Sequence, residues 1–518
     1  MKVQNPILRG FHPDPSLVKG GDGYYIATST FEWFPGICIF YSSDLANWEL
    51  VSHGLVDDTD VDLTGIDTAC GIWAPNLTYC DGIYYLMYTI VYTNRSRFKD
   101  TWNYLITAKD VRGPWSKPMF VNCSGFDPSL FHDTDGRKYV VNMTMDYRPD
   151  KNRFSGIDIQ EIDVKTGKML GEPVRVYRGS ERGFTEGPNV MKYNGTYYLI
   201  CAEGGTEYGH CSVMLRSDSI WGTYEDCPYN PIISSSGKQC QLQRAGHMQV
   251  IEVTDGKWYM AHLCSRPLDN FSILGRETAL QNVEWTEDGW IRLSANDTAT
   301  PEDDFDVPDV KENTRPKIWK YDFQDGIIPL DFLTLRKSFV ANGIFVKQNK
   351  LHIRGGCSLL SKYHQGFLAR TQESLDCDFS AVMEFEPRRL NHLAGIAVYY
   401  NYDNFYQLRI TRDENGKKAE VCSVVNRDMV CSKPVYLPEE CSTYRLIAKI
   451  RQKELQFYLK LNDEGEEIAV GESLDMRNIS DEHVHGNGFT GSMLGVGCTD
   501  VQGDGVWADF TEIRYEEY

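Results

Sequence analysis

The chain has 518 residues, and its 53 lysines and arginines stand against 73 aspartates and glutamates, which gives a formal net charge of −20. A balance this negative repels nucleic acid backbones and anionic lipid surfaces alike, so neither is an expected partner. No apolar run approaches the roughly 20 residues of a membrane-spanning helix, and the N-terminal residues lack the apolar segment of a secretory signal. We therefore predict a cytoplasmic protein without membrane association.

The cysteines support a reducing compartment. There are fifteen, scattered singly from Cys38 to Cys498 without a CxxC pair. This spacing favours reduced thiols over a disulfide framework or a zinc site.

Five segments of similar pattern follow one another over the first 290 residues. Each has a short apolar strand that begins beside a proline or a small residue, then a turn, then a strand rich in tyrosine or another aromatic. A glycine precedes the aromatic strand in every copy, at Gly23, Gly82, Gly136, Gly195 and Gly256, so the spacings are 59, 54, 59 and 61 residues. A β-rich repeat of this length is typical of propeller blades, and five copies predict five blades.

The composition changes after the fifth copy. Residues 299–318 are polar and contain prolines, which predicts a linker between a propeller domain at 1–298 and a second domain at 319–518. In the second domain, segments 380–386, 395–400, 405–410 and 444–450 alternate with a period of two among turn residues, as in an antiparallel β-sandwich. The fold class is therefore all-β.

The first strand of every propeller blade lines the central axis, so equivalent positions of the five copies should converge at one end of the channel. Alignment on the proline step puts these residues at one level: Asp14, Ala74, Asp127, Gly187 and His247. One residue earlier stand Pro13, Trp73, Phe126, Glu186 and Gly246. Three carboxylates should thus meet at the axis. Any one of them alone is explained as a turn or a solvated strand end, but three buried like charges are costly unless they are used.

Paired carboxyl groups across a pocket suit the cleavage of a glycosidic bond. One carboxyl group acts as the acid for the leaving oxygen, and the other acts as base or nucleophile at the anomeric carbon. A third carboxylate nearby keeps the acid protonated by like-charge repulsion.

Five segments together resemble the motifs of glycoside hydrolase family 43, and in particular of its β-xylosidases: residues 11–16, 73–76, 126–129, 185–188 and 275–278. Residues 394–401 and 404–406 resemble the concanavalin-like β-sandwich appended to those enzymes, so the resemblance covers essentially the whole chain. It implies an enzyme that removes xylose, with inversion, from the non-reducing end of β-1,4-xylo-oligosaccharides.

The resemblance also implies roles for the three carboxylates. Asp14 would be the general base that activates water, and Glu186 the general acid. Asp127 would orient Glu186 and raise its pKa. An inverting pair of carboxyl groups stands roughly 6.5 to 9.5 Å apart, which leaves room for the water.

The same motifs imply a sugar-binding wall. Trp73 and Phe31 would provide apolar platforms, and Arg276 would donate to sugar hydroxyls. Thr206 is a weaker match. Phe489, in the loop 488–491, would reach from the sandwich over the mouth of the pocket; the alternative is that it belongs to the sandwich core.

His247 is the candidate metal ligand. In some relatives the corresponding histidine helps to hold a divalent cation in the channel, whereas others need no metal. We expect no required cofactor and keep calcium near His247 as an alternative. The expected partner is a xylo-oligosaccharide substrate, and the resemblance implies a homodimer or a homotetramer.

Two alternatives to the β-xylosidase remain open. An α-L-arabinofuranosidase, or a bifunctional enzyme, would use the same acid, base and arginine, because the two sugars present similar hydroxyl geometry. A non-catalytic sugar-binding protein would use the same scaffolds, but it is expected to lack at least one of the three carboxylates, and all are present.

Overall fold

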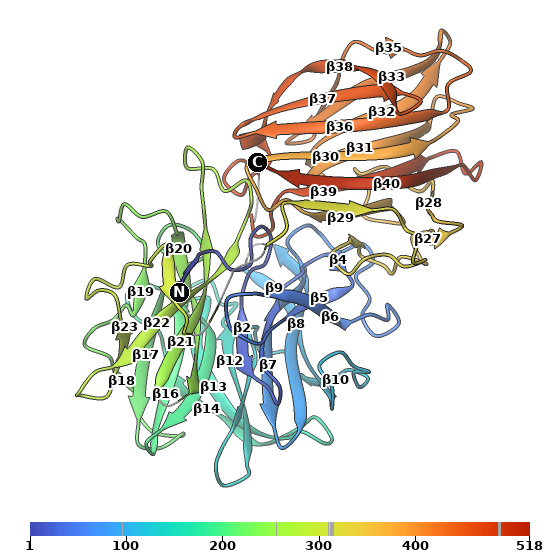
Figure 1. Ribbon diagram of the computed structural model, residues 1–518. Coiled ribbons are helices and arrows are strands. Elements are labelled where there is room, and N and C mark those ends of the chain that lie inside the picture. The colour runs from blue at the N-terminus through green and yellow to red at the C-terminus, as the bar shows by residue number, and fades with distance from the viewer. Residues whose placement is uncertain (96, 255, 309, 311–314, 485–487) are drawn as a thin grey trace.

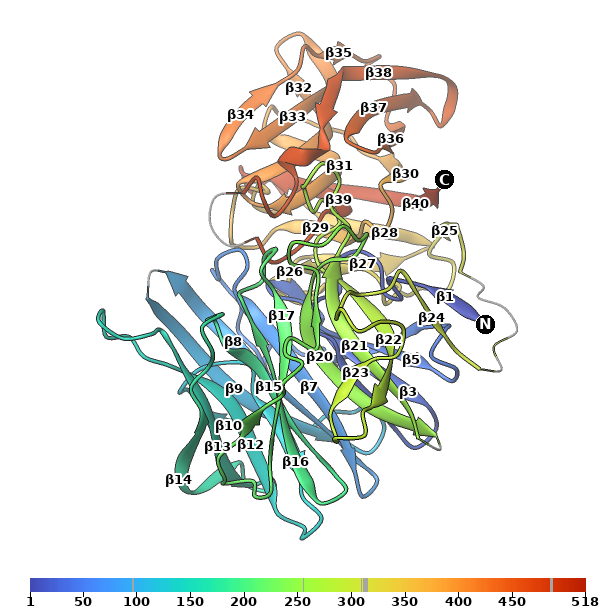
Figure 2. The ribbon, with the colours of Figure 1, turned by 90° about the vertical axis from the view of Figure 1, so that its left-hand side faces the viewer.

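The computed structural model describes residues 1–95, 97–254, 256–308, 310, 315–484 and 488–518. Within these ranges the regular secondary structure is all strand, apart from one 3-10 helix at Met476–Asn478, and no helix is long and apolar enough to cross a membrane. The chain forms two stacked bodies, a propeller and a sandwich that covers one end of it (Figures 1 and 2).

The first body is a β-propeller of five antiparallel sheets, which confirms the prediction from the repeat spacing. Blade 1 is β2 (Ser16–Lys19), β3 (Tyr24–Thr28), β5 (Gly36–Ser42) and β6 (Glu49–Leu55). Blade 2 is β7 (Gly71–Cys80), β8 (Ile83–Arg95), β9 (Phe98–Ala108) and β10 (Met119–Asn122). Blade 3 is β11 (Ser129–His132), β12 (Lys138–Met145), β13 (Phe154–Asp163) and β14 (Lys168–Tyr177). Blade 4 is β15 (Glu186–Tyr193), β16 (Thr196–Glu203), β17 (Cys211–Ser217), β18 (Glu225–Asp226) and β19 (Ile233–Ser234). Blade 5 is β20 (Gln243–Thr254), β21 (Lys257–Ser265), β22 (Glu277–Trp285) and β23 (Ile291–Leu293).

Where the five blades meet at the axis, each has the same backbone feature. The equivalent residue of every blade has a left-handed backbone conformation, with φ of 56° at Asp14, 33° at Ala74, 52° at Asp127, 56° at Gly187 and 51° at His247. Four of these are not glycine, so the conformation is strained and must be held by the surrounding structure. Below this level the axis narrows to a cavity of about 20 Å³ that is lined by residues of all five blades.

Side chains two positions after the left-handed residue join neighbouring blades. Each accepts a hydrogen bond from a backbone N–H of the adjacent blade. The N–H of Leu17 donates to Gln249 Oε1 (2.7 Å), that of Leu77 to Ser16 Oγ (2.8 Å) and that of Leu130 to Asn76 Oδ1 (2.9 Å). Buried backbone donors need such partners, which gives the proline-Ser/Asn-apolar step its structural reason.

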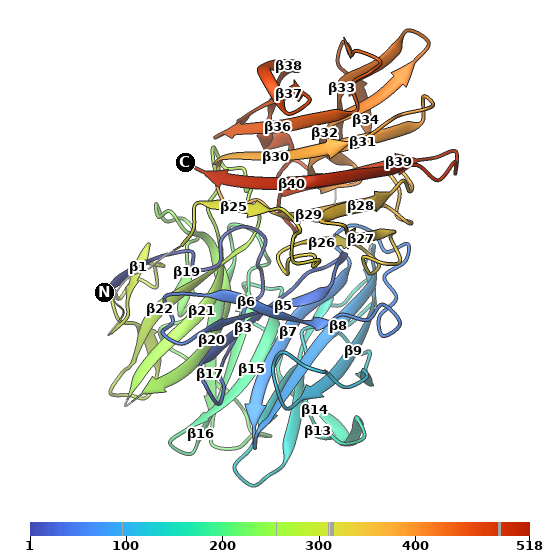
Figure 3. The same cartoon turned by 45° about the vertical axis from the view of Figure 1, so that its right-hand side comes forward.

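The second body is a sandwich of two antiparallel sheets, and in Figure 3 the long strands of one of these sheets lie one above another. One sheet contains β25 (Ile318–Tyr321), β27 (Ile344–Lys347), β28 (Lys350–Arg354), β30 (Asp376–Glu384), β36 (Thr443–Arg451), β37 (Glu454–Leu461), β38 (Glu464–Asp475) and β40 (Trp507–Glu517). The other contains β26 (Leu333–Leu335), β29 (Gly366–Thr371), β31 (His392–Asn401), β32 (Asn404–Asp413), β33 (Gly416–Val425), β34 (Asp428–Cys431), β35 (Val435–Tyr436) and β39 (Met493–Asp500). Their inward residues form one apolar core.

Two strand pairs join segments that are far apart in the sequence. The short strand β4 (Trp33–Phe34), which lies in the first repeat, pairs with β26 at the edge of the sandwich. The strand β1 (Lys2–Gln4) pairs with β24 (Asp304–Asp306), which falls inside the stretch predicted as a linker. The sandwich is therefore joined to the propeller by backbone pairing as well as by side-chain packing.

A further crossing lies beside the channel mouth. The N–H of Ser492 donates to the carbonyl oxygen of Ile273 (3.0 Å), so the sandwich loop runs directly over the backbone at Gly275. Gly275 has a φ of 78°, and a Cβ at this position would lie 2.1 Å from the carbonyl oxygen of Thr490. Only glycine permits so close an approach.

We expect Gly275→Ala to lower the melting temperature and the activity together. The left-handed backbone alone costs about 1–2 kcal/mol, and overpacking adds about 1–3 kcal/mol. Gly136→Ala is the matched control, because Gly136 has a φ of 87° but open space around its Cβ position. Equal melting temperatures for the two variants, measured by calorimetry, would contradict the proposed tight crossing.

Candidate functional site

The channel opens toward the sandwich in a pocket of about 450 Å³. All nine residues singled out from the sequence line it: Asp14, Phe31, Trp73, Asp127, Glu186, Thr206, His247, Arg276 and Phe489. A larger cavity of about 810 Å³ lies between the N-terminal segment and the end of the chain, but of its two glutamates Glu517 is ion-paired with Arg9 and Arg315, and Glu49 is exposed. The smaller pocket is therefore the candidate site.

Asp14 is held as a carboxylate. One of its oxygens accepts a hydrogen bond from Ser29 Oγ (2.6 Å), and the other accepts one from Arg276 Nη1 (2.9 Å). His247 Nδ1 lies 3.9 Å from the same oxygen as Arg276. Burial opposes ionisation, but Arg276, His247 and Ser29 outweigh it and hold the pKa of Asp14 below its ordinary value. A buried, ionised carboxylate is suited to accept a proton.

Glu186 and Asp127 show the opposite behaviour. Burial raises the pKa of Glu186 to about 7; Lys99 opposes this effect and the charge of Asp14 adds to it. Burial, then the charges of Glu186 and Asp14, raise the pKa of Asp127 well above its ordinary value, although Asp127 Oδ2 accepts the N–H of Gly187 (2.9 Å). The pair retains a proton near neutral pH, so this side of the pocket can donate one.

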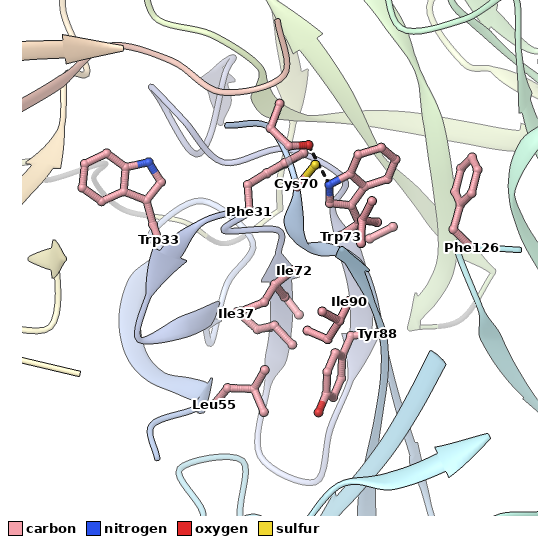
Figure 4. Close-up of a cluster of buried hydrophobic side chains, with 14 of the residues drawn as sticks. Phe31, Trp33, Ile37, Leu55, Cys70, Ile72, Trp73, Tyr88, Ile90 and Phe126 are labelled. Atoms are coloured by element: carbon pink, nitrogen blue, oxygen red, sulfur yellow. Dashed lines mark hydrogen bonds between the residues drawn. The ribbon is translucent and has the colours of Figure 1, made fainter. Parts of the chain in front are cut away.

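Aromatic rings form the wall of the pocket. The ring centroids of Phe31 and Trp73 lie 5.7 Å apart, and the ring of Phe126 meets Trp73 edge-on at 5.5 Å. Trp73 is fixed by a hydrogen bond from its Nε1 to the carbonyl oxygen of Ala69 (3.1 Å). Figure 4 shows these three rings in one row along the top of the buried cluster. Such faces suit the C–H surface of a sugar.

Phe489 completes this wall from the sandwich. Its ring lies 6.1 Å from that of Phe31 and 5.5 Å from that of Trp73, so it packs on the propeller side rather than in the sandwich core. Its carbonyl oxygen accepts hydrogen bonds from Arg276 Nε and Nη2, both at 3.1 Å. Since the same guanidinium binds Asp14, Arg276 ties the position of the loop to the position of the carboxylate.

The remaining two predicted residues lie at the side and at the base of the pocket. Thr206 follows β16 and is half-buried in the wall. The His247 ring lies against Gly187, where a Cβ would be 3.0 Å from the ring. Within the described ranges of the chain, no group of three or more His, Cys, Asp or Glu side chains is arranged to hold a metal ion. Calcium at His247 stays an untested alternative.

Several residues of the site were not identified from the sequence. They are Lys99, Phe126, Arg153, Phe154 and His210, which line the pocket, and Ser29, which donates a hydrogen bond to Asp14. Phe126 carried a usable signal, because it stands in the same repeat position as Trp73 and Glu186. The others lie on later strands or on loops, where the repeat alignment does not show which residues face the channel.

Comparisons with known proteins agree over the whole length. A model of "Glycosyl hydrolases family 43" matches residues 3–291, and one of "Beta xylosidase C-terminal Concanavalin A-like domain" matches residues 320–516. Xylosidase/arabinosidase 43B of Humicola insolens is 40% identical, over 99% of this chain and 97% of that protein. A Beta-xylosidase of Bacillus subtilis is 37% identical over 100% of both chains. The crystal structure of a xylan beta-1,4-xylosidase from Bacillus halodurans C-125 matches with a TM-score of 0.96 at 41% identity, over 99% and 100% of the two chains.

We expect Glu186→Gln to stabilise the protein at pH 8 and to have little effect at pH 4.5. A carboxyl group with a folded pKa near 7 and an unfolded pKa near 4.5 contributes its full stability below pH 4.5 and loses it as the pH rises through 7. The loss is on the order of 3 kcal/mol, and the glutamine variant avoids it.

Melting temperatures of wild type and variant across this pH range measure the difference. Glu287→Gln is the matched control, because Glu287 is exposed. A constant difference between Glu186→Gln and wild type at every pH would show that Glu186 titrates normally.

Proposed function

The chain belongs to glycoside hydrolase family 43, and from this premise we propose that it is an exo-acting, inverting β-1,4-xylosidase that releases xylose from the non-reducing end of xylo-oligosaccharides. One observation carries the proposal: a single pocket holds an ionised carboxylate, Asp14, and a carboxyl group, Glu186, whose pKa is raised to about 7. The names of the full-length relatives support xylose as the sugar.

The proposed reaction is a single displacement. Asp14 accepts a proton from a water molecule as the water oxygen attacks the anomeric carbon. Glu186 gives its proton to the glycosidic oxygen, which leaves with the bonding electron pair. Asp127 acts through Glu186, because the two carboxyl groups together retain a proton near neutral pH and Asp127 keeps that proton available to the acid.

The walls of the pocket explain why the substrate would be cleaved at its end. Phe489 and Arg276 join the sandwich to the propeller beside Asp14, so the pocket is a closed end rather than an open groove on this side. The proposed terminal sugar packs against the wall that the rings of Phe31, Trp73 and Phe489 form together. Uncharged sugars need this combination of apolar faces and fixed donors.

An α-L-arabinofuranosidase activity is the second candidate, because the Humicola insolens relative carries both names. The same acid, base and arginine would serve both sugars. Xylose is preferred because the Bacillus relatives are named for xylosidase activity alone.

None of the fifteen cysteines, all of which lie in the described ranges, forms a disulfide bond; this supports a reducing compartment, and we propose the cytoplasm. The dimer or tetramer stays a prediction. No step of the proposed reaction requires a cofactor.

We expect Asp14→Ala and Glu186→Ala each to lower kcat on xylobiose by about 100- to 10,000-fold, the range that general acid or base catalysis contributes. The first-formed xylose should be the α anomer, because water attacks opposite the leaving group. Proton NMR of the fresh product distinguishes the anomers. A β anomer would require a covalent intermediate and would contradict Asp14 as a base.

For substrate choice, we expect kcat/KM on 4-nitrophenyl β-D-xylopyranoside to exceed that on 4-nitrophenyl α-L-arabinofuranoside by at least about tenfold, which corresponds to about 1.4 kcal/mol. A reversed ratio would favour the second candidate. Binding of xylobiose by folded protein without release of xylose would instead favour a sugar-binding protein.

A further inference from the structure

A buried lysine faces the candidate site. Lys99 is the second residue of β9, whose alternation turns Lys99, Thr101 and Asn103 inward. Only 5% of its surface is exposed. Its backbone is fixed by the Tyr147 hydroxyl, which donates to the Lys99 carbonyl oxygen (2.9 Å).

The ammonium group of Lys99 lies over aromatic faces. Nζ is 4.4 Å from the ring centroid of Phe126 and 4.6 Å from that of Trp73. Within the described part of the chain, no carboxylate oxygen lies within 4.0 Å of Nζ and no hydrogen bond joins it to protein. Aromatic faces offset only part of the cost of burying a charge, so a buried ammonium in this position needs a further reason.

The two cations Arg276 and Lys99 act on different carboxyl groups of the pocket. Arg276 binds Asp14 directly. Lys99 exerts the largest effect of any charged group on Glu186, and it also acts on Asp127. The charged and titratable groups that act on this corner are Asp14, Cys70, Lys99, Asp127, Arg153, Glu186, His247 and Arg276.

We propose that Lys99 is a positioning residue for proton transfer, whose ammonium stabilises the Glu186 carboxylate that forms as the proton passes to the glycosidic oxygen. This inference rests on the proposed function. In that step the O–H bond of Glu186 breaks, the proton binds the glycosidic oxygen, and one negative charge appears on Glu186 while Lys99 keeps its proton. A fixed cation beside a developing charge needs no reorganisation during the reaction.

The environment of Lys99 fits this role. Burial lowers its pKa to about 8, and the charge of Glu186 opposes that shift. Lys99 therefore stays protonated near neutral pH, where the acid must still hold its own proton. The cation also limits the rise of the Glu186 pKa, so that Glu186 can release the proton as well as carry it.

The test compares Lys99→Met, which keeps the length of the side chain and loses the charge, with Lys99→Arg, which retains the charge. Two substrates separate the roles: xylobiose has a poor leaving group that needs protonation, and 4-nitrophenyl β-D-xylopyranoside has a good one. Lys109→Met is the matched control, because Lys109 is exposed just beyond the end of the same strand.

We expect Lys99→Met to move the basic limb of the kcat/KM profile upward by about one pH unit, since loss of the cation raises the pKa of Glu186. Its kcat on xylobiose should fall about tenfold more than its kcat on the nitrophenyl substrate. Lys99→Arg should restore most of both properties, and Lys109→Met should match wild type.

An equal loss on both substrates with an unmoved basic limb would assign Lys99 a merely structural role and overturn the inference. Lys99→Gln provides a second neutral variant if the methionine variant does not fold. Failure of the proposed function is distinguishable, because wild type would then release no xylose from xylobiose.

Discussion

The structure depends on how five strands begin at one axis. Each blade places one residue in a left-handed conformation there, and in three neighbouring pairs of blades a side chain two positions later accepts a backbone N–H across the blade boundary. This arrangement fixes the direction of the left-handed residue and of the residue before it. Asp14 and Asp127 occupy the first of these positions, and Trp73 and Glu186 the second. The site is therefore a consequence of blade closure.

Charge then differentiates the positions that the backbone makes equivalent. Asp14 has a guanidinium and a hydroxyl within hydrogen-bonding distance, whereas the corner that holds Asp127 and Glu186 has a lysine without an ion pair among the described residues. The first environment favours a carboxylate and the second retains a proton. The raised pKa of Glu186 means that its ionisation destabilises the fold, which is a common relation between an active site and stability, whereas the lowered pKa of Asp14 means that its ionisation favours the folded state.

The sandwich contributes to the same site through Arg276. Its guanidinium contacts the Asp14 carboxylate and the Phe489 carbonyl oxygen, so movement of the sandwich loop would disturb the carboxylate as well. The tight crossing at Gly275 and the strand pair β4–β26 fix the loop relative to the propeller. The second domain is thus part of the pocket.

The sequence predicted the parts of the site that follow from repeat position or from family motifs. Asp14, Asp127 and Glu186 were found because each copy could be aligned on its proline step, while Arg276 and Phe489 were placed by resemblance. Lys99 and Ser29 were missed because they lie outside the first strand of a blade, where a repeat does not reveal which alternate residues reach the axis. The pairing of β4 with the sandwich was also missed, since two residues carry no strand pattern of their own.

The central claim is that Asp14 acts through water and does not attack the sugar itself. A crystal structure of Glu186→Gln with bound xylobiose tests it most directly. The account predicts an ordered water that is hydrogen-bonded to Asp14 and lies about 3–3.5 Å from the anomeric carbon, on the face opposite residue 186. An Asp14 oxygen in direct contact with the anomeric carbon, with the two side chains only about 5–5.5 Å apart, would contradict it.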